Sequence, residues 1–505
     1  MDAPDQSAYG PTWYAATTPL PAPRVTLKFD LDADACVIGG GLAGLTVARE
    51  LARRGWSVVL VEAVRIAWNA SGRNSGFVLP GFSTKVEKVV ERIGLPATKA
   101  LWSLSEQGVQ YVKRTIAEIG MPGIEEGRGW LEVSKIPDAD RAQERIELLA
   151  QEFGVELEAW PTERVRDVLK TNRYFHAIHF PGAFHINPLA YALALATAAE
   201  QAGVQIFEHT PALKIDPAGV RKRIVTPQGR VRVGHVVLAG NVHLGAVAQR
   251  LADTLVPVTG YTGVTKPLGP KLTDAIGFSG AISDSRNANY HYRIVGGDRL
   301  LWTGAINPLG GTPMLWGMLR AISLTYPQLG RVEFERYWAA DMGFAVHRMP
   351  QVGEVQPAVW LASAFGGQGL NTSAVAGELI ARGMVEGDDS WRVFLPYELV
   401  WAGGLAGRIV ARTAAWWSNQ NEHLSARLAR RREELSRRQQ REASGLPAAE
   451  PRPAYRTVSA ARAAAGRDVK DADRPIAAPE ARPRAEPRRR PPPDAQPQAA
   501  SPPRP

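Results

Sequence analysis

The stretch from Asp34 to Glu62 constrains the fold of this chain more than any other part of the sequence. A short apolar run over 35–38 leads directly into the glycine loop Gly39-Gly40-Gly41-Leu42-Ala43-Gly44. Apolar residues then recur at helical spacing, and a second apolar run follows at 57–61. A strand, a tight turn, a helix and a strand within about 30 residues begin a βαβ unit, so the two strands are expected in one parallel sheet.

The glycine loop has the form G-x-G-x-x-G. Gly39 permits the sharp turn, Gly41 leaves room for a pyrophosphate, and Gly44 lets the helix approach the strand. Phosphates bind at such a helix N-terminus because free N–H groups and the helix dipole favour anions. Glu62 follows Gly44 by 18 residues, where an acid accepts hydrogen bonds from ribose hydroxyls and disfavours a 2′-phosphate. The pattern predicts a dinucleotide site that includes Gly39, Gly41, Leu42, Ala43, Gly44 and Glu62.

Two features favour FAD as this dinucleotide. The glycine loop lies near the N-terminus, and no second G-x-G-x-x-G motif is present for a pyridine nucleotide. After Glu62 the chain continues in a polar, glycine-containing loop over 67–76, which suits a bulky, partly polar ring. Arg73 either holds a phosphate or substrate carboxylate or bonds loop carbonyls as a structural residue. The residues of this loop expected at the cofactor are Ser71, Gly72, Arg73 and Asn74.

The rest of the chain alternates between helical and strand patterns, and the segment 256–305 is typical of an antiparallel sheet. Helices are expected within 83–119 and over 138–152, 188–202 and 372–385. Strands are expected over 128–133, 204–207, 222–225, 231–233, 235–240, 289–294, 299–304 and 359–364. The fold class is therefore α/β plus α+β, with a Rossmann-like cofactor part and a large antiparallel or mixed sheet.

The net charge of +10 comes mostly from the C-terminal end. Residues 421–505 carry 19 Lys and Arg against 11 Asp and Glu, which leaves +2 for the first 420 residues. The segment 405–442 is expected to be a basic helix. The segment 443–505, rich in Pro, Ala and Arg, is expected to be disordered. The helical part 409–441 with Trp416-Trp417 is expected to dock on the protein body, the alternative being an anionic membrane surface.

Several classes of site are disfavoured. Cys36 is the single cysteine, so an intrachain disulfide and a Cys-based metal cluster are excluded. The nine His show no metal-ligand spacing, and no metal is expected. The N-terminus has no secretory signal and no apolar stretch reaches 18 residues, so we expect a cytoplasmic protein without a transmembrane segment. The tail can attract nucleic acid by charge alone, and no specific nucleic-acid binding is expected.

Motifs in a fixed order extend this picture over about residues 10–420. They are WYAAT at 13–17, VIGGGLAGL at 37–45, ASGRNSG at 70–76, YR at 292–293, GDRLLWTG at 297–304, MPQVG at 349–353 and FGGQGLNT at 365–372. In these motifs the chain resembles the D-amino-acid-oxidase-like superfamily of flavoenzymes. It most resembles the bacterial branch that includes γ-glutamylputrescine oxidase and the sarcosine and glycine oxidases.

The resemblance implies a discontinuous FAD-binding domain and a substrate domain. We expect an extended arm over 1–30. The FAD-binding domain is expected from 31–85, 185–245 and 350–400, and the substrate domain from 86–184 and 246–349. The late glycine-rich loop is expected to run past the flavin, with its helix N-terminus near the pyrimidine end of the ring. The loop residues concerned are Gly367, Gln368, Gly369, Leu370 and Asn371.

The chain departs from the family pattern at three places. Members with covalent flavin use a Cys or His at defined positions. In this chain Cys36 is expected to be buried in the first strand, and the loop 67–76 has no His, so noncovalent FAD is expected. Many relatives have His where Gln368 stands. Sarcosine oxidases have a Lys where Asn371 stands, and its loss favours an amine or a larger amide-bearing substrate over a sarcosine-like α-carboxylate.

The resemblance implies oxidation of the C–N bond of an amine or amino acid. A hydride passes to flavin N5, the imine is hydrolysed, and O2 or an electron-transfer partner reoxidises the flavin. Aromatic residues of the antiparallel sheet are expected to hold the ammonium by cation–π contact. The candidate substrate residues are Tyr261, Tyr290, Tyr292, Arg293, Gln368 and Asn371. Two alternatives are a flavin-dependent dehydrogenase of a hydroxy acid or polyol, and a flavoprotein that associates with nucleic acid through its basic tail.

Overall fold

A computed structural model describes residues 7–121, 127–284, 290–307 and 315–404, together with separate positions between 406 and 439. Residues 1–435 form one compact unit. Every residue described between 404 and 439 is helical, and the basic helix expected over 405–442 stays a prediction. The Trp416-Trp417 pair and the tail 443–505 lie outside the described residues.

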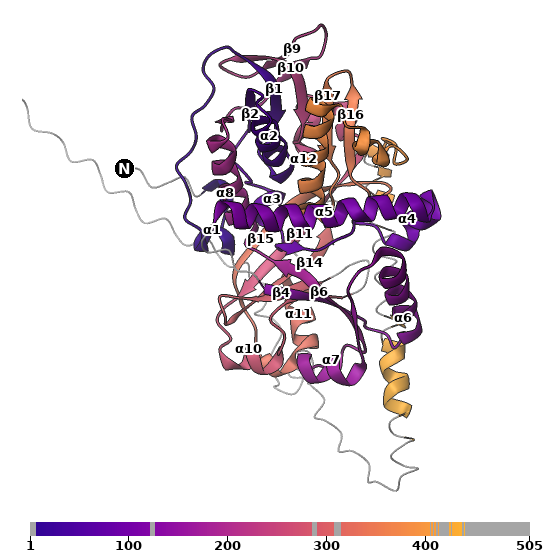
Figure 1. The fold of residues 1–505 in the computed structure, drawn as a ribbon. Helices are drawn as coiled ribbons and strands as arrows, with labels where there is room; N and C mark the ends of the chain where they lie inside the picture. The colour runs from indigo at the N-terminus through magenta and orange to yellow at the C-terminus, as the bar shows by residue number, and fades with distance from the viewer. Residues whose placement is uncertain are drawn as a thin grey trace, which may run out of the picture. The chain divides into compact units, whose positions relative to one another are not determined.

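The first sheet, sheet A, forms the upper half of the ribbon in Figure 1 and contains the predicted βαβ unit. Its strand order is β16-β17-β10-β1-β2-β7, in which β17, β10, β1, β2 and β7 are parallel and β16 is antiparallel to β17. The short strands β8 and β9 add to the first half of β10. The bounds are β1 Leu31–Ile38, β2 Val58–Val61, β7 Gln205–Phe207, β8 Lys214–Asp216, β9 Lys222–Val225, β10 Arg230–Leu238, β16 Gln351–Gln356 and β17 Val359–Ser363.

Helix α2 packs on both α8 and α12 beside sheet A (Figure 1). They span Leu42–Arg53, Pro188–Gln201 and Gly369–Glu386, and the long helix α5, Leu95–Ile119, packs on α8 and α12. Their apolar side chains form one core with residues of β1 and β2, including Val37, Leu45 and Leu60. Burial of this apolar surface stabilises the sheet edge from which the glycine loop emerges.

The second sheet, sheet B, is predominantly antiparallel and has the order β15-β11-β14-β13-β12-β4-β6-β3, with β5 beside β6. Only β12 and β4 pair in parallel among its described strands. The bounds are β3 Phe77–Val78, β4 Gly127–Val133, β5 Glu158–Trp160, β6 Ala177–His185, β11 Leu255–Thr265, β12 Ala281–Asp284, β13 His291–Val295, β14 Arg299–Asn307 and β15 Phe334–Ala345.

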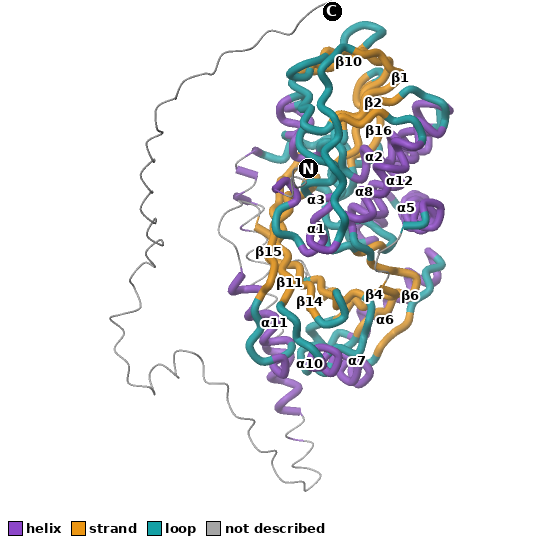
Figure 2. Tube along the Cα trace, turned by 90° about the vertical axis from the view of Figure 1, so that its left-hand side faces the viewer, coloured by secondary structure: helices purple, strands orange, loops and turns teal. Residues whose placement is uncertain are grey.

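One face of sheet B is covered by helices α7 Thr162–Leu169, α10 Pro270–Ala275 and α11 Leu315–Thr325. Figure 2 shows these helices below the strands, on the side away from sheet A. Leu131, Tyr292 and Trp302 from the sheet and Met318 from α11 belong to the core on this face. The opposite face of the sheet is therefore the one available to a site between the two sheets.

The predicted fold class is confirmed, with differences in detail. The expected strands 231–233 and 235–240 are one strand, β10, because both of its halves pair with β1. The loop 67–76 contains a short helix, α3 Ala70–Arg73, and α12 begins at Gly369, three residues before the predicted start at residue 372. The region 83–119 contains α4 Val86–Ile93 and α5, and α6 Ala139–Glu147 continues as a π-helical turn, Leu148–Glu152.

The strands of sheet A come from the segments predicted for the FAD-binding domain. The strands of sheet B come from those predicted for the substrate domain, except β3 and the end of β6. Because contacts join residues 1–435 into one unit, the division into domains stays a prediction. Within the described residues, no helix is both long and apolar enough to cross a membrane.

Candidate functional site

A cavity of about 1280 Å³ lies between the ends of the sheet A strands and the free face of sheet B. Its lining includes the glycine loop, α3, the start of α12 and cavity-facing positions of β4, β11, β13, β14 and β15. Sites for small molecules usually measure about 300–1,000 Å³. The volume therefore suits a large cofactor together with a substrate.

The glycine loop has the geometry that its glycines predicted. Gly39 has φ +113°, and a Cβ there would lie 2.8 Å from the Ala239 carbonyl group. A Cβ on Gly44 would overlap the carbonyl oxygen of Gly39. Gly41 lies on the cavity, where a Cβ would approach Ser71 Oγ to 2.8 Å. Only glycine permits the turn and the close approach of α2 at these positions.

Ser71 joins the loop 67–76 to the N-terminus of α2. Its hydroxyl oxygen accepts a hydrogen bond of 3.0 Å from the N–H of Leu42, in the first turn of the helix. First-turn N–H groups have no acceptor within their own helix. Leu42 and Ala43 also line the cavity, so the positive end of the α2 dipole is directed at its contents.

Glu62 lies beside the glycine loop, as its spacing predicted. One carboxylate oxygen accepts a hydrogen bond of 2.6 Å from Gly40 N–H, and the other accepts one of 2.9 Å from Val64 N–H. The side chain is buried yet lines the cavity. Burial raises the pKa of Glu62, and the two backbone hydrogen bonds oppose this effect. The acid is thus held in one orientation with lone pairs left for a further donor.

The residues predicted in the loop 67–76 differ in their placement. Arg73 donates to the carbonyl oxygens of Ala339 and Ala8, at 3.2 and 3.1 Å, while its buried Nε has no partner among the described residues. Burial lowers the pKa of Arg73, and the negative charge of Asp341 opposes this effect. The interpretation of Arg73 as a structural residue is supported by these carbonyl contacts, although it also lines the cavity.

Asn74 and Gly72 have structural contacts in the same turn. The Asn74 amide donates to the carbonyl oxygens of Ala70 and Ser71 and accepts from Gly76 N–H. Gly72 does not line the cavity, because it packs against α8, where a Cβ would lie 2.9 Å from Leu189 Cδ1. The expectation that Gly72 contacts the cofactor is therefore not supported.

The late glycine-rich loop reaches the cavity through Gly367, Gln368, Gly369 and Leu370. The Oε1 atom of Gln368 is buried and has no hydrogen-bond partner in the described part of the chain. Asn371 does not line the cavity. Its amide donates to the carbonyl oxygens of Gly81 and Ser105, at 3.1 and 3.4 Å, because α12 starts early enough to turn this residue toward α5. The predicted role of Asn371 at the substrate is not supported.

The tyrosines predicted at the substrate lie on the wrong face of sheet B. Tyr261 stacks on Tyr337 with ring centroids 5.9 Å apart. Tyr292 stacks on Trp302 at 4.3 Å in the core beneath the sheet, and Tyr290 packs beside the same indole. None of these tyrosines lines the cavity. Side chains alternate along a strand, so the cavity-facing positions are sequence neighbours of these tyrosines, namely Gly260, Thr262 and His291. Ser283 and Thr303 line the cavity from β12 and β14.

Arg293 also lies outside the cavity lining. Its guanidinium donates to the carbonyl oxygens of Ser75 and Ile186, at 3.2 and 3.1 Å, and lies 2.8 Å from His185 Nδ1. Burial and the Arg293 charge lower the pKa of His185 to about 3. Arg293 therefore supports the segment that follows α3 from outside the cavity lining.

Sequence reasoning missed the polar and aromatic wall formed by β4, β12 and the 85–145 region. Trp130 and Phe180 lie with ring centroids 4.7 Å apart, and Trp102 and Phe77 add further aromatic surface. Two acids of this wall have cationic partners: Glu132 pairs with Arg145, and Asp284 with Lys135. The basic side chains in the lining here are Lys85, Lys88, Arg141 and Arg145. The sequence signal that could have indicated this wall was Glu132, an acid among the apolar residues of a predicted strand.

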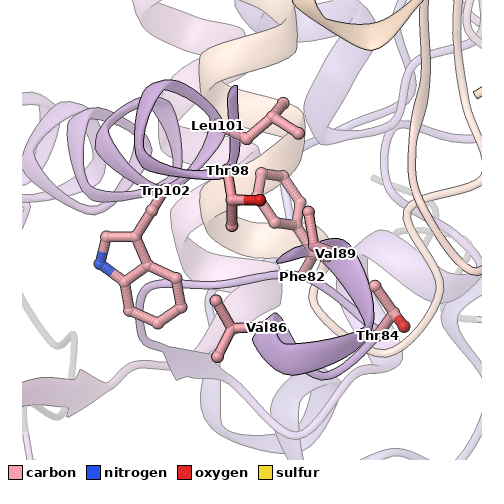
Figure 3. A pocket seen from close by; sticks show the side chains of 7 residues that line it. All are labelled: Phe82, Thr84, Val86, Val89, Thr98, Leu101 and Trp102. Carbon is pink, nitrogen blue, oxygen red and sulfur yellow. The ribbon is translucent and has the colours of Figure 1, made fainter. Parts of the chain in front are cut away.

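A much smaller cavity adjoins this wall (Figure 3). The side chains of Phe82, Val86, Leu101 and Trp102 surround it, and its volume is about 10 Å³. A space of this size holds roughly one water molecule. Phe82, Val86 and Trp102 also line the large cavity, so the small one is a recess of the same wall.

The residues present fit FAD. Gly41 leaves a cradle that a Cβ would fill, and it lies at the positive end of a helix suited to a pyrophosphate. Glu62 retains acceptor capacity for ribose hydroxyls. The unpartnered Oε1 of Gln368 and Nε of Arg73 suit a flavin, whose ring edge carries both donors and acceptors. Among the described residues, no three His, Cys, Asp or Glu side chains are placed to hold a metal ion.

Comparisons with known proteins agree with this site. The family model described as FAD dependent oxidoreductase matches residues 34–382. Gamma-glutamylputrescine oxidoreductase of Escherichia coli is 28% identical over 81% of this chain and 97% of its own length. The probable oxidoreductase OrdL of Rhizobium meliloti is 29% identical over 74% of this chain and 87% of its own.

Solved structures show the same fold. Glycine oxidase from Bacillus cereus superposes with a TM-score of 0.59 at 21% identity, covering 72% of this chain and 98% of its own. L-proline dehydrogenase from P. horikoshii gives 0.61 at 19% identity, covering 73% and 98%. The chain therefore belongs to the FAD dependent oxidoreductase family, as its motifs predicted, and it is an enzyme whose cofactor is FAD.

Proposed function

We propose that this enzyme oxidises the C–N bond of a small amine or amino acid. The observation that carries the proposal is one continuous cavity, which joins the glycine loop and the α12 N-terminus to a wall with both acids and aromatic rings. FAD, held by the glycine loop and the start of α12, would supply the two-electron acceptor for the hydride that leaves the carbon next to the amine nitrogen. Water then adds to the imine, giving a carbonyl product and a released amine or ammonia.

The chain's own residues bind and orient the reactants in this proposal. The N-terminal ends of α2 and α12 stabilise negative charge on the cofactor. Trp130, Phe180 and Phe77 shield the reacting carbon from water and offer faces to a cation. The E. coli relative is named for an amine-bearing substrate, which supports an amine here as well.

Noncovalent attachment of FAD is part of the proposal. Cys36 is fully buried in β1 and outside the cavity lining, and burial raises the pKa of its thiol to about 12. Acid precipitation of the purified protein should therefore release all flavin absorbance into the supernatant. A flavin that remains with the pellet would contradict noncovalent binding.

Anaerobic reduction tests the reaction class. The purified yellow protein is mixed with a panel of amines and amino acids and, separately, with hydroxy acids and polyols. Bleaching of the flavin by an amine, with a carbonyl compound and amine or ammonia as products, is the expected result. Bleaching by hydroxy acids or polyols alone would instead establish the alternative dehydrogenase.

The electron acceptor is measured in the same preparation. The fold occurs both in a glycine oxidase and in an L-proline dehydrogenase, and therefore leaves both O2 and a protein carrier as acceptors. Stoichiometric peroxide on admission of air identifies O2 as the acceptor. Slow reoxidation in air, with rapid reoxidation by an artificial carrier dye, identifies a carrier.

A further inference from the structure

Three cavity residues on neighbouring strands form a hydrogen-bonded chain. The indole Nε1 of Trp130, on β4, lies 2.7 Å from Ser283 Oγ, on β12. The same Oγ lies 2.6 Å from Nδ1 of His291, on β13. All three side chains line the cavity. Because β13, β12 and β4 are adjacent in sheet B, this row of hydrogen bonds runs across the face of the sheet that lines the cavity.

The directions of these bonds follow from the groups involved. An indole N–H is a donor only, so Ser283 Oγ accepts from Trp130. The Ser283 hydroxyl has one proton, and its only acceptor among the described residues is His291 Nδ1. The side chain is buried, so a hydroxyl proton without an acceptor would be costly. This arrangement favours Nδ1 of His291 as the acceptor, with the ring proton on Nε2.

The surroundings keep the imidazole neutral. Burial lowers the pKa of His291, and the charges of Asp284 and Glu132 oppose this effect. Both acids are paired with cations, Lys135 and Arg145, which weakens their influence on the ring. Phe77 lies edge-on to the imidazole at 5.7 Å and adds apolar surface. A neutral ring with a fixed tautomer offers one donor, Nε2–H, and no acceptor to the cavity.

We propose that His291 is a specificity-determining residue whose Nε2–H donates a hydrogen bond to a carbonyl or carboxylate oxygen of the substrate. The inference rests on the proposed function, because it takes this end of the cavity as the substrate site. An acyl oxygen suits the donor better than the reacting amine does. The amine needs its lone pair to expel the hydride, and a hydrogen bond to that lone pair would slow the reaction.

Nitrogen NMR tests the tautomer independently of turnover. The holoenzyme is labelled with ¹⁵N-histidine, and His291 is assigned by the signals lost in His291→Gln. A protonated Nε2 and an unprotonated Nδ1 are expected at neutral pH. Ser283→Ala should shift the Nδ1 signal, whereas Ser323→Ala, on the exposed face of α11, should leave it unchanged. A protonated Nδ1, or a fully protonated ring, would overturn the inference.

Substrate discrimination tests the acceptor. Three amines of matched length are compared: an N-acetylated diamine, an ω-amino acid and a plain n-alkylamine. In His291→Phe, kcat/KM should fall about tenfold or more for whichever acyl-bearing amine is used, and by less than about twofold for the alkylamine. His291→Gln, which keeps an N–H donor, should recover part of the loss. The acyl compound that loses most identifies the oxygen as amide or carboxylate.

The outcomes separate the two proposals. Equal losses for all three amines in His291→Phe, at normal flavin content, would overturn the role of His291 and leave amine oxidation standing. If no amine bleaches the flavin, the proposed function fails. The inference is then decided by whether the saturating ω-amino acid or N-acetylated diamine displaces the Nε2–H resonance, and no displacement by either refutes it.

Discussion

The Glu62 carboxylate accepts a hydrogen bond of 2.6 Å from the backbone N–H of Gly40, so the acid and the glycine loop form one rigid unit. A second bond to Val64 N–H fixes the other carboxylate oxygen. The orientation of this acid is therefore set by the backbone before any cofactor binds.

Replacement of Glu62 by Gln should weaken FAD binding about 10- to 100-fold. An amide cannot accept from both backbone N–H groups, and one of them loses a charge-assisted bond of about 1.5–3 kcal/mol. Flavin fluorescence titration of the apoprotein measures the change in Kd. Glu200→Gln, which alters a partly exposed ion pair with Arg24, is the control and should keep the parental Kd.

Substitution of Gly44 by Ala should lower stability by about 2 kcal/mol or more, because the added Cβ overlaps the Gly39 carbonyl oxygen. Thermal unfolding of the holoenzyme and its flavin content are the measurements. Gly182→Ala is the matched control, since a Cβ there meets no atom within 4 Å. Similar melting temperatures for the two variants would show that α2 can move away from β1 without cost.

The Lys135–Asp284 pair should show strong coupling, because both side chains are buried. Asp284→Asn leaves the Lys135 ammonium without its counter-charge and should cost about 3–5 kcal/mol. The double variant Lys135→Met with Asp284→Asn should recover much of this loss. Denaturant unfolding of the four proteins gives the coupling free energy, and additive losses would contradict a buried pair.

Stability should decline in acid through His185, whose folded-state pKa is about 3. The unfolded histidine takes a proton near pH 6.5, whereas the folded one stays neutral down to about pH 3. The stabilisation is complete above about pH 6.5 and is lost as the pH falls toward 3, by roughly 1 kcal/mol per pH unit. His185→Gln should flatten this part of the profile in urea unfolding, and an unchanged slope would assign the loss to other groups.

The part of the cavity beside the glycine loop could be predicted from sequence because the residues that shape it are close together in the chain. The turn at Gly39, the approach at Gly44 and the acid at Glu62 lie within one βαβ unit, where spacing fixes geometry. The sequence pattern predicts two strands in place of β10 because Gly234 interrupts the apolar residues. In the structure, pairing with β1 continues on both sides of Gly234.

The residues of sheet B that face the cavity could not be predicted, because they depend on how strands far apart in the sequence pair with one another. Tyr292 and His291 are neighbours in sequence, and only the pairing of β13 with β12 and β14 decides which of them faces the cavity. The same holds for Asn371, whose direction follows from packing of α12 against α5. A pattern of alternate residues reveals a strand without revealing which face is covered.

The side chains on the two faces of sheet B have different roles. One set of alternate side chains, including Tyr292 and Trp302, is committed to the helices beneath the sheet, and a change there endangers folding. The other set, including His291 and Thr303, looks onto the cavity and can vary without disturbing that packing. Substitutions at every second residue of a strand can therefore change which substrate is bound, while the packing of the helices beneath the sheet stays intact.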